Sequence, residues 1–471
     1  MSTSTDTSAL LDAITVAPEH GRAVPDAASG ETIGYVREQT AADLDRAIDR
    51  ARAAQPGWAG LGHEERARLL HLAADEVDAH AEELALIIAR EQGKPLNGPG
   101  ARFEAGGCAV WIRSAADTVL ETEVLFEAEG TRSELHYVPL GVVAAIGPWN
   151  WPALIAIWQI APALRMGNTV VAKPSEYTPL SVLAVVELMN RHLPADVLQV
   201  VTGGREVGAA IAAHPGVDKV MFTGSTKTGR EIVKGSANNL ARLTLELGGN
   251  DPGIVLPGSD AKAIAEGLFW GAFINTGQTC AALKRLYVHD SVYEDVVDEL
   301  SKIAASMQLG PGTSEDSQLG PLSNRQQFDI VTRLVEDARA RGARIVTGGE
   351  AAPELGAHFY RATIVADIDD GAPLVDEEQF GPVVPVIRYT DVEDAITRAN
   401  SSEQGLGASV WGDPVEARRV AERIDSGTVW INQHGTLNPM VAFGGVKGSG
   451  YGLEFGAHGL KAVAAPKVIT I

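Results

Sequence analysis

The chain has 471 residues, more than one hydrophobic core usually organises, so we expect two or three domains. With 45% hydrophobic and 21% charged residues, its composition is that of a folded protein, which argues against extensive disorder. A net charge of −22 argues against nucleic acid and anionic membrane surfaces as partners, because both attract basic patches.

The N-terminal segment and the two cysteines indicate in which compartment of the cell the protein is found. MSTSTDTSAL has neither the basic nor the apolar part of a secretory signal, so we expect a frayed polar tail. Cys108 and Cys280 do not make a disulfide framework, and no Cys-x-x-Cys pair or Cys/His cluster indicates a metal site. We therefore expect a cytoplasmic protein that binds no metal.

The first third of the chain is predicted to be largely helical. Apolar residues recur with the helical period in 41–54, 64–79 and 81–91, between residues of high helix propensity. Residues 133–141 alternate in polarity, which predicts a strand.

The stretch from Gly141 to Leu164 carries no charge over 24 residues, which is long enough for a helix to cross a bilayer. Pro148 and Pro152 would break such a helix in its middle. The pattern is better explained by a buried strand at 142–146, a tight turn at 147–152 and a buried helix at 153–164. We therefore expect no membrane span.

From Gly167 onward, short apolar strands alternate with helices and Gly-rich turns. The predicted helices are 179–191, 206–214 and 228–238, and the strand ARLTLELGG ends this series. Such alternation is typical of a parallel, doubly wound sheet, whose ligands bind at the carboxyl ends of its strands.

A second alternation of strands and helices follows Asp251 and predicts a second α/β domain. Ser291 with Glu294, and Ser323 with Gln326, each form the pattern of a capping box at the start of a helix.

Cys280 lies in the segment NTGQTCAALKR, whose small and polar residues are not typical of a core. A free cysteine is only ~3% thiolate at pH 7, and nearby positive charge such as Lys284 or Arg285 would raise that fraction. The alternative is a buried structural thiol, the commoner role of a lone cysteine. Cys108, within the helical FEAGGCAVW, fits that alternative better.

Glu246 ends an apolar strand just before Gly248 and Gly249. Burial there would raise the pKa of its carboxyl group toward neutrality, which suits a general base. The alternative is a glutamate that caps a helix or holds a loop. The nearby turn FTGSTKTG could bind phosphate on its backbone N–H groups, although it is not a G-x-G-x-x-G motif.

Seven segments, in this order, resemble the NAD(P)-dependent aldehyde dehydrogenase superfamily: GPWNWP, KPSEYTP, FTGSTKTG, LELGGNDP, NTGQTC, EEQFGPV and FGGVKGSG. The resemblance implies an α/β fold with a Rossmann-type NAD-binding domain (1–118 and 141–249) and a second α/β catalytic domain (250–442). It also implies a small β oligomerisation element (119–140 and 443–471), and hence a homodimer or homotetramer.

The resemblance also implies catalytic roles. Cys280 attacks the aldehyde carbonyl and forms a thiohemiacetal. The side chain of Asn150 and the backbone N–H of Cys280 donate to the developing oxyanion. Loss of hydride leaves a thioester, and Glu246 activates the water that hydrolyses it to the acid.

For the cofactor, the resemblance places Lys173 and Glu176 on the adenosine ribose. A carboxylate there binds the ribose hydroxyls and repels a 2′-phosphate, which favours NAD over NADP. Gly224 and Ser225 resemble the residues that contact the pyrophosphate in this family. Glu378 and Phe380 resemble the residues that hold the nicotinamide ribose and ring. The remaining positions expected around the cofactor are Ile146, Trp149, Gly204 and Gly208.

Trp151, Trp158 and Phe443 match positions that line the substrate tunnel in this family, which favours an apolar or aromatic aldehyde. The alternative is that they only pack the core. Two other functions stay open: a CoA-acylating dehydrogenase, which would not need Glu246, and a catalytically silent NAD-binding or structural member. Esterase activity would fit only as a side reaction.

Overall fold

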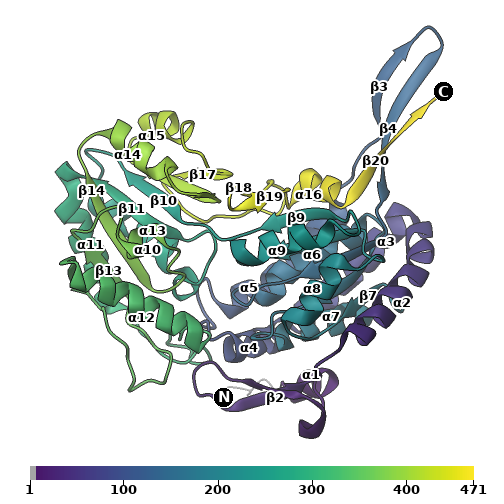
Figure 1. Cartoon of the computed structure of the whole chain (residues 1–471), viewed down its shortest axis with the longest axis horizontal. Helices are drawn as coiled ribbons and strands as arrows, with labels where there is room; N and C mark the ends of the chain where they lie inside the picture. Colours follow the sequence, from purple (N-terminus) through teal and green to yellow (C-terminus); the bar gives the residue numbers. More distant parts are fainter. Residues whose placement is uncertain (1–6) are drawn as a thin grey trace.

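The structure is a computed structural model that describes residues 7–471. Most of the predicted polar tail, residues 1–6, lies outside the described residues, and helix α1 (Ser8–Ile14) begins soon after it. Figure 1 shows two α/β lobes side by side and a narrow arm that projects away from both.

The first lobe is built on a six-stranded sheet of order β19-β9-β8-β5-β6-β7. Its strands are β5 (Val142–Ile146), β6 (Thr169–Lys173), β7 (Leu198–Val200), β8 (Lys219–Thr223), β9 (Arg242–Glu246) and β19 (Gly450–Tyr451). All neighbours are parallel except β19, which pairs antiparallel with β9. The chain leaves the central β5 toward β6 and returns on its other side at β8, so the sheet has the topological switch point at which doubly wound folds bind ligands.

Helices cover both faces of this sheet, as the sequence predicts for parallel strands. Val142, Ala144 and Ile146 of β5 pack in a core shared with α2, α8 and α9, whereas Val143 and Ala145 pack in a core shared with α3 to α7. The helices are α2 (Ala41–Gly60), α3 (Gly62–Ala79), α4 (Ala81–Glu91), α5 (Ala101–Asp117), α6 (Pro152–Arg165), α7 (Leu180–Asn190), α8 (Arg205–Ala213) and α9 (Thr226–Ser236).

Helix α2 runs six residues past its predicted end. The helical period predicted an end at Ala54, but Trp58 is buried and its indole N–H donates to the backbone oxygen of Leu164 (3.0 Å). Tertiary packing here outweighs local helix propensity.

The uncharged stretch forms β5 and α6, and every residue of both is buried. The prediction of a strand, a turn and a helix is therefore confirmed. Between residues 7 and 471, no helix is long and apolar enough to cross a membrane.

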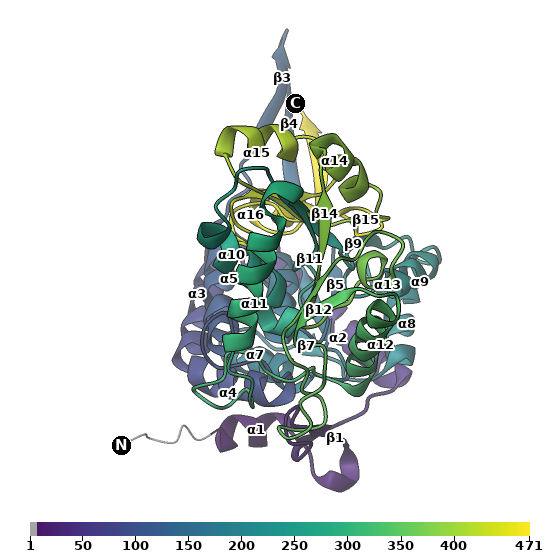
Figure 2. The ribbon, with the colours of Figure 1, turned by 90° about the vertical axis from the view of Figure 1, so that its left-hand side faces the viewer.

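The second lobe is built on a seven-stranded sheet of order β12-β13-β14-β11-β10-β16-β17, in which only β12 is antiparallel to its neighbour. Its strands are β10 (Asp251–Val255), β11 (Leu283–His289), β12 (Arg344–Thr347), β13 (Thr363–Ala366), β14 (Val383–Tyr389), β16 (Gly407–Trp411) and β17 (Thr428–Ile431). Helices α10 (Ala261–Phe273) and α11 (Tyr293–Ser306) cover one face. The other face packs against α12 (Arg325–Ala340), α13 (Pro373–Asp376), α14 (Val392–Asn400) and α15 (Pro414–Ala421). Figure 2 shows α11 and α12 on opposite sides of these strands.

Both predicted capping boxes are wrong. Ser291 lies in the 3-10 turn η3 (Asp290–Val292), where its backbone N–H donates to the His289 ring, and α11 then begins without a side-chain cap. Helix α12 is capped one residue later than predicted, because the Asn324 side chain accepts from the backbone N–H of Gln327 (3.0 Å).

The arm is an antiparallel sheet of order β20-β4-β3, formed by β3 (Glu123–Ala128), β4 (Thr131–Pro139) and β20 (Ala464–Thr470). It joins two segments far apart in the sequence and stands clear of both lobes in Figures 1 and 2. The remaining elements are η1 (Pro18–His20), β1 (Arg22–Pro25), β2 (Thr32–Val36), η2 (Ile274–Gly277), β15 (Gln404–Gly405), β18 (Val446–Lys447) and α16 (Gly456–Ala462).

Candidate active site

The carboxyl ends of the parallel strands bring the predicted cofactor residues to one edge of the first sheet. Ile146, the last residue of β5, lies opposite Lys173 of β6 and Phe222 of β8. Thr223 lies opposite Glu246, and Gly224 donates its backbone N–H to the Glu246 carbonyl (3.0 Å). Ser225 then caps α9, its hydroxyl accepting from the backbone N–H of Thr228 (3.2 Å).

Lys173, Glu176, Gly204 and Gly208 lie together beside this edge. A Cβ atom at Gly208 would lie 3.7 Å from Cε of Lys173, and one at Gly204 would lie 3.5 Å from Oε2 of Glu176. Burial lowers the pKa of Lys173, while the charge of Glu176 partly offsets that effect. The two glycines keep the space next to Lys173 and Glu176 free of side chains, and Glu176 is exposed.

The loop that carries Cys280 has an unusual backbone. Asn275 and Thr276 are buried with φ of 51° and 56°, and Gly277 follows with φ of 73°. A Cβ at Gly277 would lie 2.1 Å from the backbone oxygen of Gly381. Consecutive non-glycine residues in the left-handed region are strained, and such strain concentrates at functional sites.

Asn150 lies against this loop, and its side-chain amide donates to the backbone oxygen of Gln278 (3.0 Å). The backbone oxygen of Asn150 accepts from Nδ2 of Asn275 (2.9 Å) and from Nζ of Lys94 (2.8 Å). Lys94 in turn pairs with Glu104 (2.5 Å), and both side chains are fully buried. The other carboxylate oxygen of Glu104 accepts from two backbone N–H groups at the start of α6.

Sequence reasoning missed Lys94 and Glu104, because these contacts join residues about fifty positions apart. Glu104 alone gave a signal, as a charged residue in the otherwise uncharged FEAGGCAVW, whereas Lys94 lies in the polar stretch EQGKPLNGPG.

Glu246 is 4% exposed, and neither of its carboxylate oxygens has a hydrogen-bond partner among residues 7–471. Burial raises the pKa of Glu246 well above its usual value, and the neighbouring Glu454 raises it further. Burial also raises the pKa of Glu454 to about 8, partly opposed by Lys219. The environment of Glu246 is therefore that of a general base. The second buried carboxyl group, that of Glu454, was not predicted from the sequence.

The thiol of Cys280 is weakly acidic in this state. Burial raises its pKa to about 12, and the charge of Lys284 opposes that shift. The negative charge of Glu246 raises the pKa of the thiol further. At neutral pH the thiol is protonated, so a base must take its proton before it can attack.

Glu378 and Phe380 reach the site from the segment between α13 and β14. The Glu378 carboxylate accepts from Nζ of Lys284 (2.8 Å) and from the backbone N–H of Gly249 (3.2 Å). The Phe380 ring meets the Trp149 ring edge to face, with 5.2 Å between centroids. The structure thus brings residues from both lobes together around Cys280.

The three residues predicted to line the tunnel are buried aromatic residues. Trp158 and Phe443 both contact the ring of Phe455, at centroid distances of 4.8 and 6.0 Å. The indole N–H of Trp151 donates to the hydroxyl of Thr279 (2.9 Å), next to Cys280 in sequence. The same hydrophobic cluster packs against Cys280.

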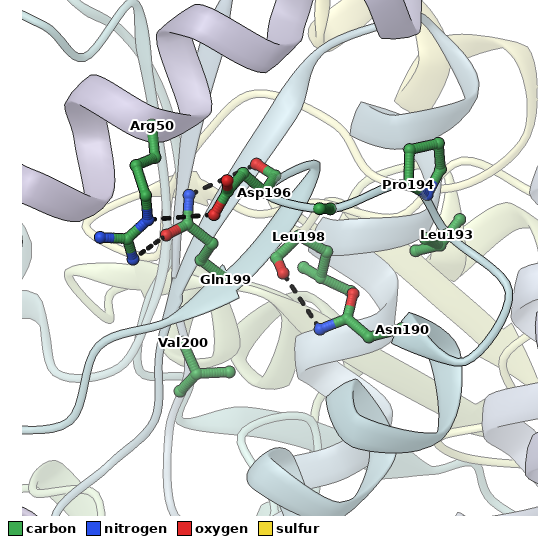
Figure 3. Close-up of a pocket in the computed structure, with 9 residues that line it drawn as sticks. Arg50, Asn190, Leu193, Pro194, Asp196, Leu198, Gln199 and Val200 are labelled. Atoms are coloured by element: carbon green, nitrogen blue, oxygen red, sulfur yellow. Dashed lines mark hydrogen bonds and ion pairs between the residues drawn. The ribbon is translucent and has the colours of Figure 1, made fainter.

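A separate hollow of about 380 Å³ lies beside β7 (Figure 3). Its charged group, Arg50, is already paired with Asp196 (3.0 Å) and with the side chain of Gln199 (2.6 Å). None of the residues predicted for catalysis or cofactor binding lines it. Within residues 7–471 no group of three or more His, Cys, Asp or Glu side chains could hold a metal ion.

Comparison with known proteins identifies relatives along nearly the whole chain. The model of the aldehyde dehydrogenase family matches residues 16–469. Phenylacetaldehyde dehydrogenase of Pseudomonas fluorescens is 38% identical over 458 residues, which cover 94% of this chain and 91% of that protein. Other curated relatives are named for retinaldehyde and for glutarate semialdehyde.

Solved structures agree with this result. An aldehyde dehydrogenase from Bacillus cereus in complex with NAD+ is 36% identical, with a TM-score of 0.89 and coverage of 96% of this chain and 93% of that one. An NADP-dependent enzyme from Escherichia coli is 36% identical, with a TM-score of 0.92 and coverage of 96% and 94%. The predicted fold class is therefore confirmed.

Proposed function

Because the chain belongs to the aldehyde dehydrogenase family, we propose that it oxidises an aldehyde to the carboxylic acid through a thioester on Cys280, with NAD as the hydride acceptor. The observation that carries this proposal is the environment of Glu246, a buried carboxylate with no hydrogen-bond partner in the described part of the chain. Its charge acts on the Cys280 thiol. Such a group is costly to fold unless it serves as a base.

In this proposal each step is assigned to a residue. The Cys280 thiol gives its proton to solvent water, which the positive charge of Lys284 favours, and the sulfur then bonds to the aldehyde carbon. The amide of Asn150 and the backbone N–H of Cys280 donate to the resulting oxyanion. When bound, NAD supplies the hydride acceptor that turns the thiohemiacetal into a thioester. Glu246 then deprotonates a water, which attacks the thioester, releases the acid and returns the thiol.

The residues at the sheet edge fit NAD. Gly204 and Gly208 leave room beside Lys173 and Glu176, and Ser225 begins a helix whose N-terminus can bind phosphate. The exposed carboxylate of Glu176 would bind the ribose hydroxyls and repel a 2′-phosphate.

Replacing Glu176 by glutamine should raise the ratio of kcat/KM with NADP to that with NAD by about tenfold, because the repulsion of the 2′-phosphate is removed. Initial rates with both cofactors measure this ratio. Glu206→Gln, which removes another exposed carboxylate near the start of α8, is the matched control and should leave the ratio unchanged. An unchanged ratio in Glu176→Gln would remove the reason for choosing NAD.

The substrate is an apolar or aromatic aldehyde in this proposal. Trp151, Trp158 and Phe443 supply an uncharged aromatic wall that packs against Cys280, and it offers no cation to a carboxylate. The name of the Pseudomonas fluorescens relative agrees with this class of substrate.

The proposal is tested by NADH formation across aromatic, long aliphatic, short aliphatic, amino and acidic aldehydes, with and without CoA. Turnover without CoA, highest with aromatic aldehydes, is the expected result. Turnover only with CoA would assign a CoA-acylating dehydrogenase and leave Glu246 a structural role. Protein that binds NAD but oxidises no aldehyde would indicate the catalytically silent alternative.

The arm is proposed to join copies of this chain into a dimer or tetramer. Its exposed apolar side chains would otherwise face water on a sheet with open edges. They are Val124, Leu125, Phe126, Val468, Ile469 and Ile471.

Phe126→Asp should shift the chain to a smaller assembly, because a charge would be buried in the contact. Light scattering after gel filtration measures the mass. Leu240→Asp changes an exposed leucine on the body and serves as the control. The same mass for Phe126→Asp and the unmodified chain would contradict a role of the arm in assembly.

A further inference from the structure

The ammonium group of Lys284 lies where three loops of the site meet. Lys284 is near the start of β11 and is 2% exposed. It donates to the backbone oxygens of Gly249 (2.9 Å) and Cys280 (2.5 Å) and to Oε1 of Glu378 (2.8 Å). An ammonium group has three N–H donors, so these acceptors satisfy it completely.

These three contacts connect the parts of the proposed mechanism. Gly249 follows β9, whose last residue is Glu246, and Cys280 lies in the loop before β11. The Glu378 carboxylate packs tightly against the backbone of Gly248, since a Cβ atom added to that glycine would lie only 2.4 Å from Oε2 of Glu378. One buried side chain therefore links the base-bearing strand, the nucleophile loop and the carboxylate expected at the nicotinamide ribose.

Lys284 also balances the charge around the thiol. Charged side chains from four segments act on the pKa of Cys280: Lys284, Glu246, Glu378 and Asp251. Of these, only Lys284 is a cation. His434 donates from its ring to the backbone oxygen of Ala281 (3.1 Å). It stays neutral, because burial lowers its pKa to about 3.

We propose that Lys284 is the positioning residue of this active site. Lys284 holds Glu378 and the Cys280 loop in place before the cofactor binds, and its positive charge favours the thiolate form of Cys280. The inference rests on the proposed function for the roles of Cys280 and Glu378. Arg285 offers a contrast, because it is equally buried but donates to the backbone oxygens of Asn250 and Ala399 instead.

The test compares Lys284→Met with Arg285→Met in NAD-free protein. The rate at which iodoacetamide alkylates Cys280 is followed against pH by mass spectrometry of its peptide. In Lys284→Met the thiolate fraction should fall, which slows alkylation about tenfold at each pH at which the protein is folded. Arg285→Met should keep the rate, and Lys284→Arg, which keeps the charge, should restore it.

A second measurement tests the contact with Glu378. Calorimetry should show weaker NAD binding by Lys284→Met, and the loss should be smaller when Glu378→Gln is already present, because both changes act on one contact. Circular dichroism confirms that each variant is folded.

An unchanged alkylation rate in folded Lys284→Met would overturn the inference, and so would an equal loss of rate in Arg285→Met. Independent losses of NAD affinity in the double variant would overturn the link to Glu378. A slower alkylation of Lys284→Met, in a protein that oxidises no aldehyde, would support the role of Lys284 and contradict the proposed function instead.

Discussion

Cys280→Ala should reduce aldehyde oxidation by at least about 10⁴-fold while leaving NAD affinity nearly unchanged. Without the thiol there is no atom to bond to the carbonyl carbon, and losses of this size are typical when a covalent nucleophile is removed. Steady-state NADH formation and calorimetric titration with NAD measure the two quantities separately.

Cys108→Ala is the matched control. Cys108 is fully buried in α5, its thiol donates to the backbone oxygen of Glu104 (3.3 Å), and burial raises its pKa well above the usual value. Its loss should lower stability without ending turnover. Retained oxidation in Cys280→Ala, or loss in Cys108→Ala alone, would contradict the assignment of the nucleophile.

Glu246→Gln should separate the two halves of the reaction. Glutamine keeps the size of the side chain but cannot accept a proton, so hydrolysis of the thioester should slow by about 10²–10⁴-fold. Rapid mixing with aldehyde and NAD should then show a burst of NADH close to one per active site, followed by slow turnover.

The pH dependence provides a second measure of the same role. Only the deprotonated carboxylate accepts a proton, and burial raises the pKa of Glu246, so steady-state turnover of the unmodified chain should fall as pH falls through that raised pKa. Glu246→Gln should lose this dependence. A normal steady-state rate in the variant would exclude Glu246 as the base.

The arrangement of the first lobe was predictable because its strands are apolar runs bounded by Gly-rich turns, and parallel sheets bury both faces. The strand at 142–146 and the helix that follows it were therefore placed within one residue. The end of α2 was predicted too early, since the packing of Trp58 against α6 is not visible in the local sequence. The boundaries of the domains remain predictions.

Only the residues of the candidate site that lie in recognisable sequence motifs could be predicted. The segments around Asn150, Glu246 and Cys280 were identified from their order along the chain. In the structure the Asn150 amide donates to the loop that carries Cys280, and the charge of Glu246 acts on the thiol. Lys94 and Glu104 were missed, because their contacts to the turn before α6 depend on how distant segments pack.

Lys284 was noted only as a nearby positive charge. Its three hydrogen bonds follow from the meeting of loops from β9, β11 and the segment before β14, which no single stretch of sequence encodes.

The most direct test of the account is the mass of the Cys280 peptide from Glu246→Gln protein, quenched in acid after mixing with NAD and an aromatic aldehyde. The account predicts that this peptide gains the mass of the acyl group and that the Cys108 peptide does not. An unmodified Cys280 peptide, in protein that has formed its burst of NADH, would contradict the thioester and with it the proposed mechanism.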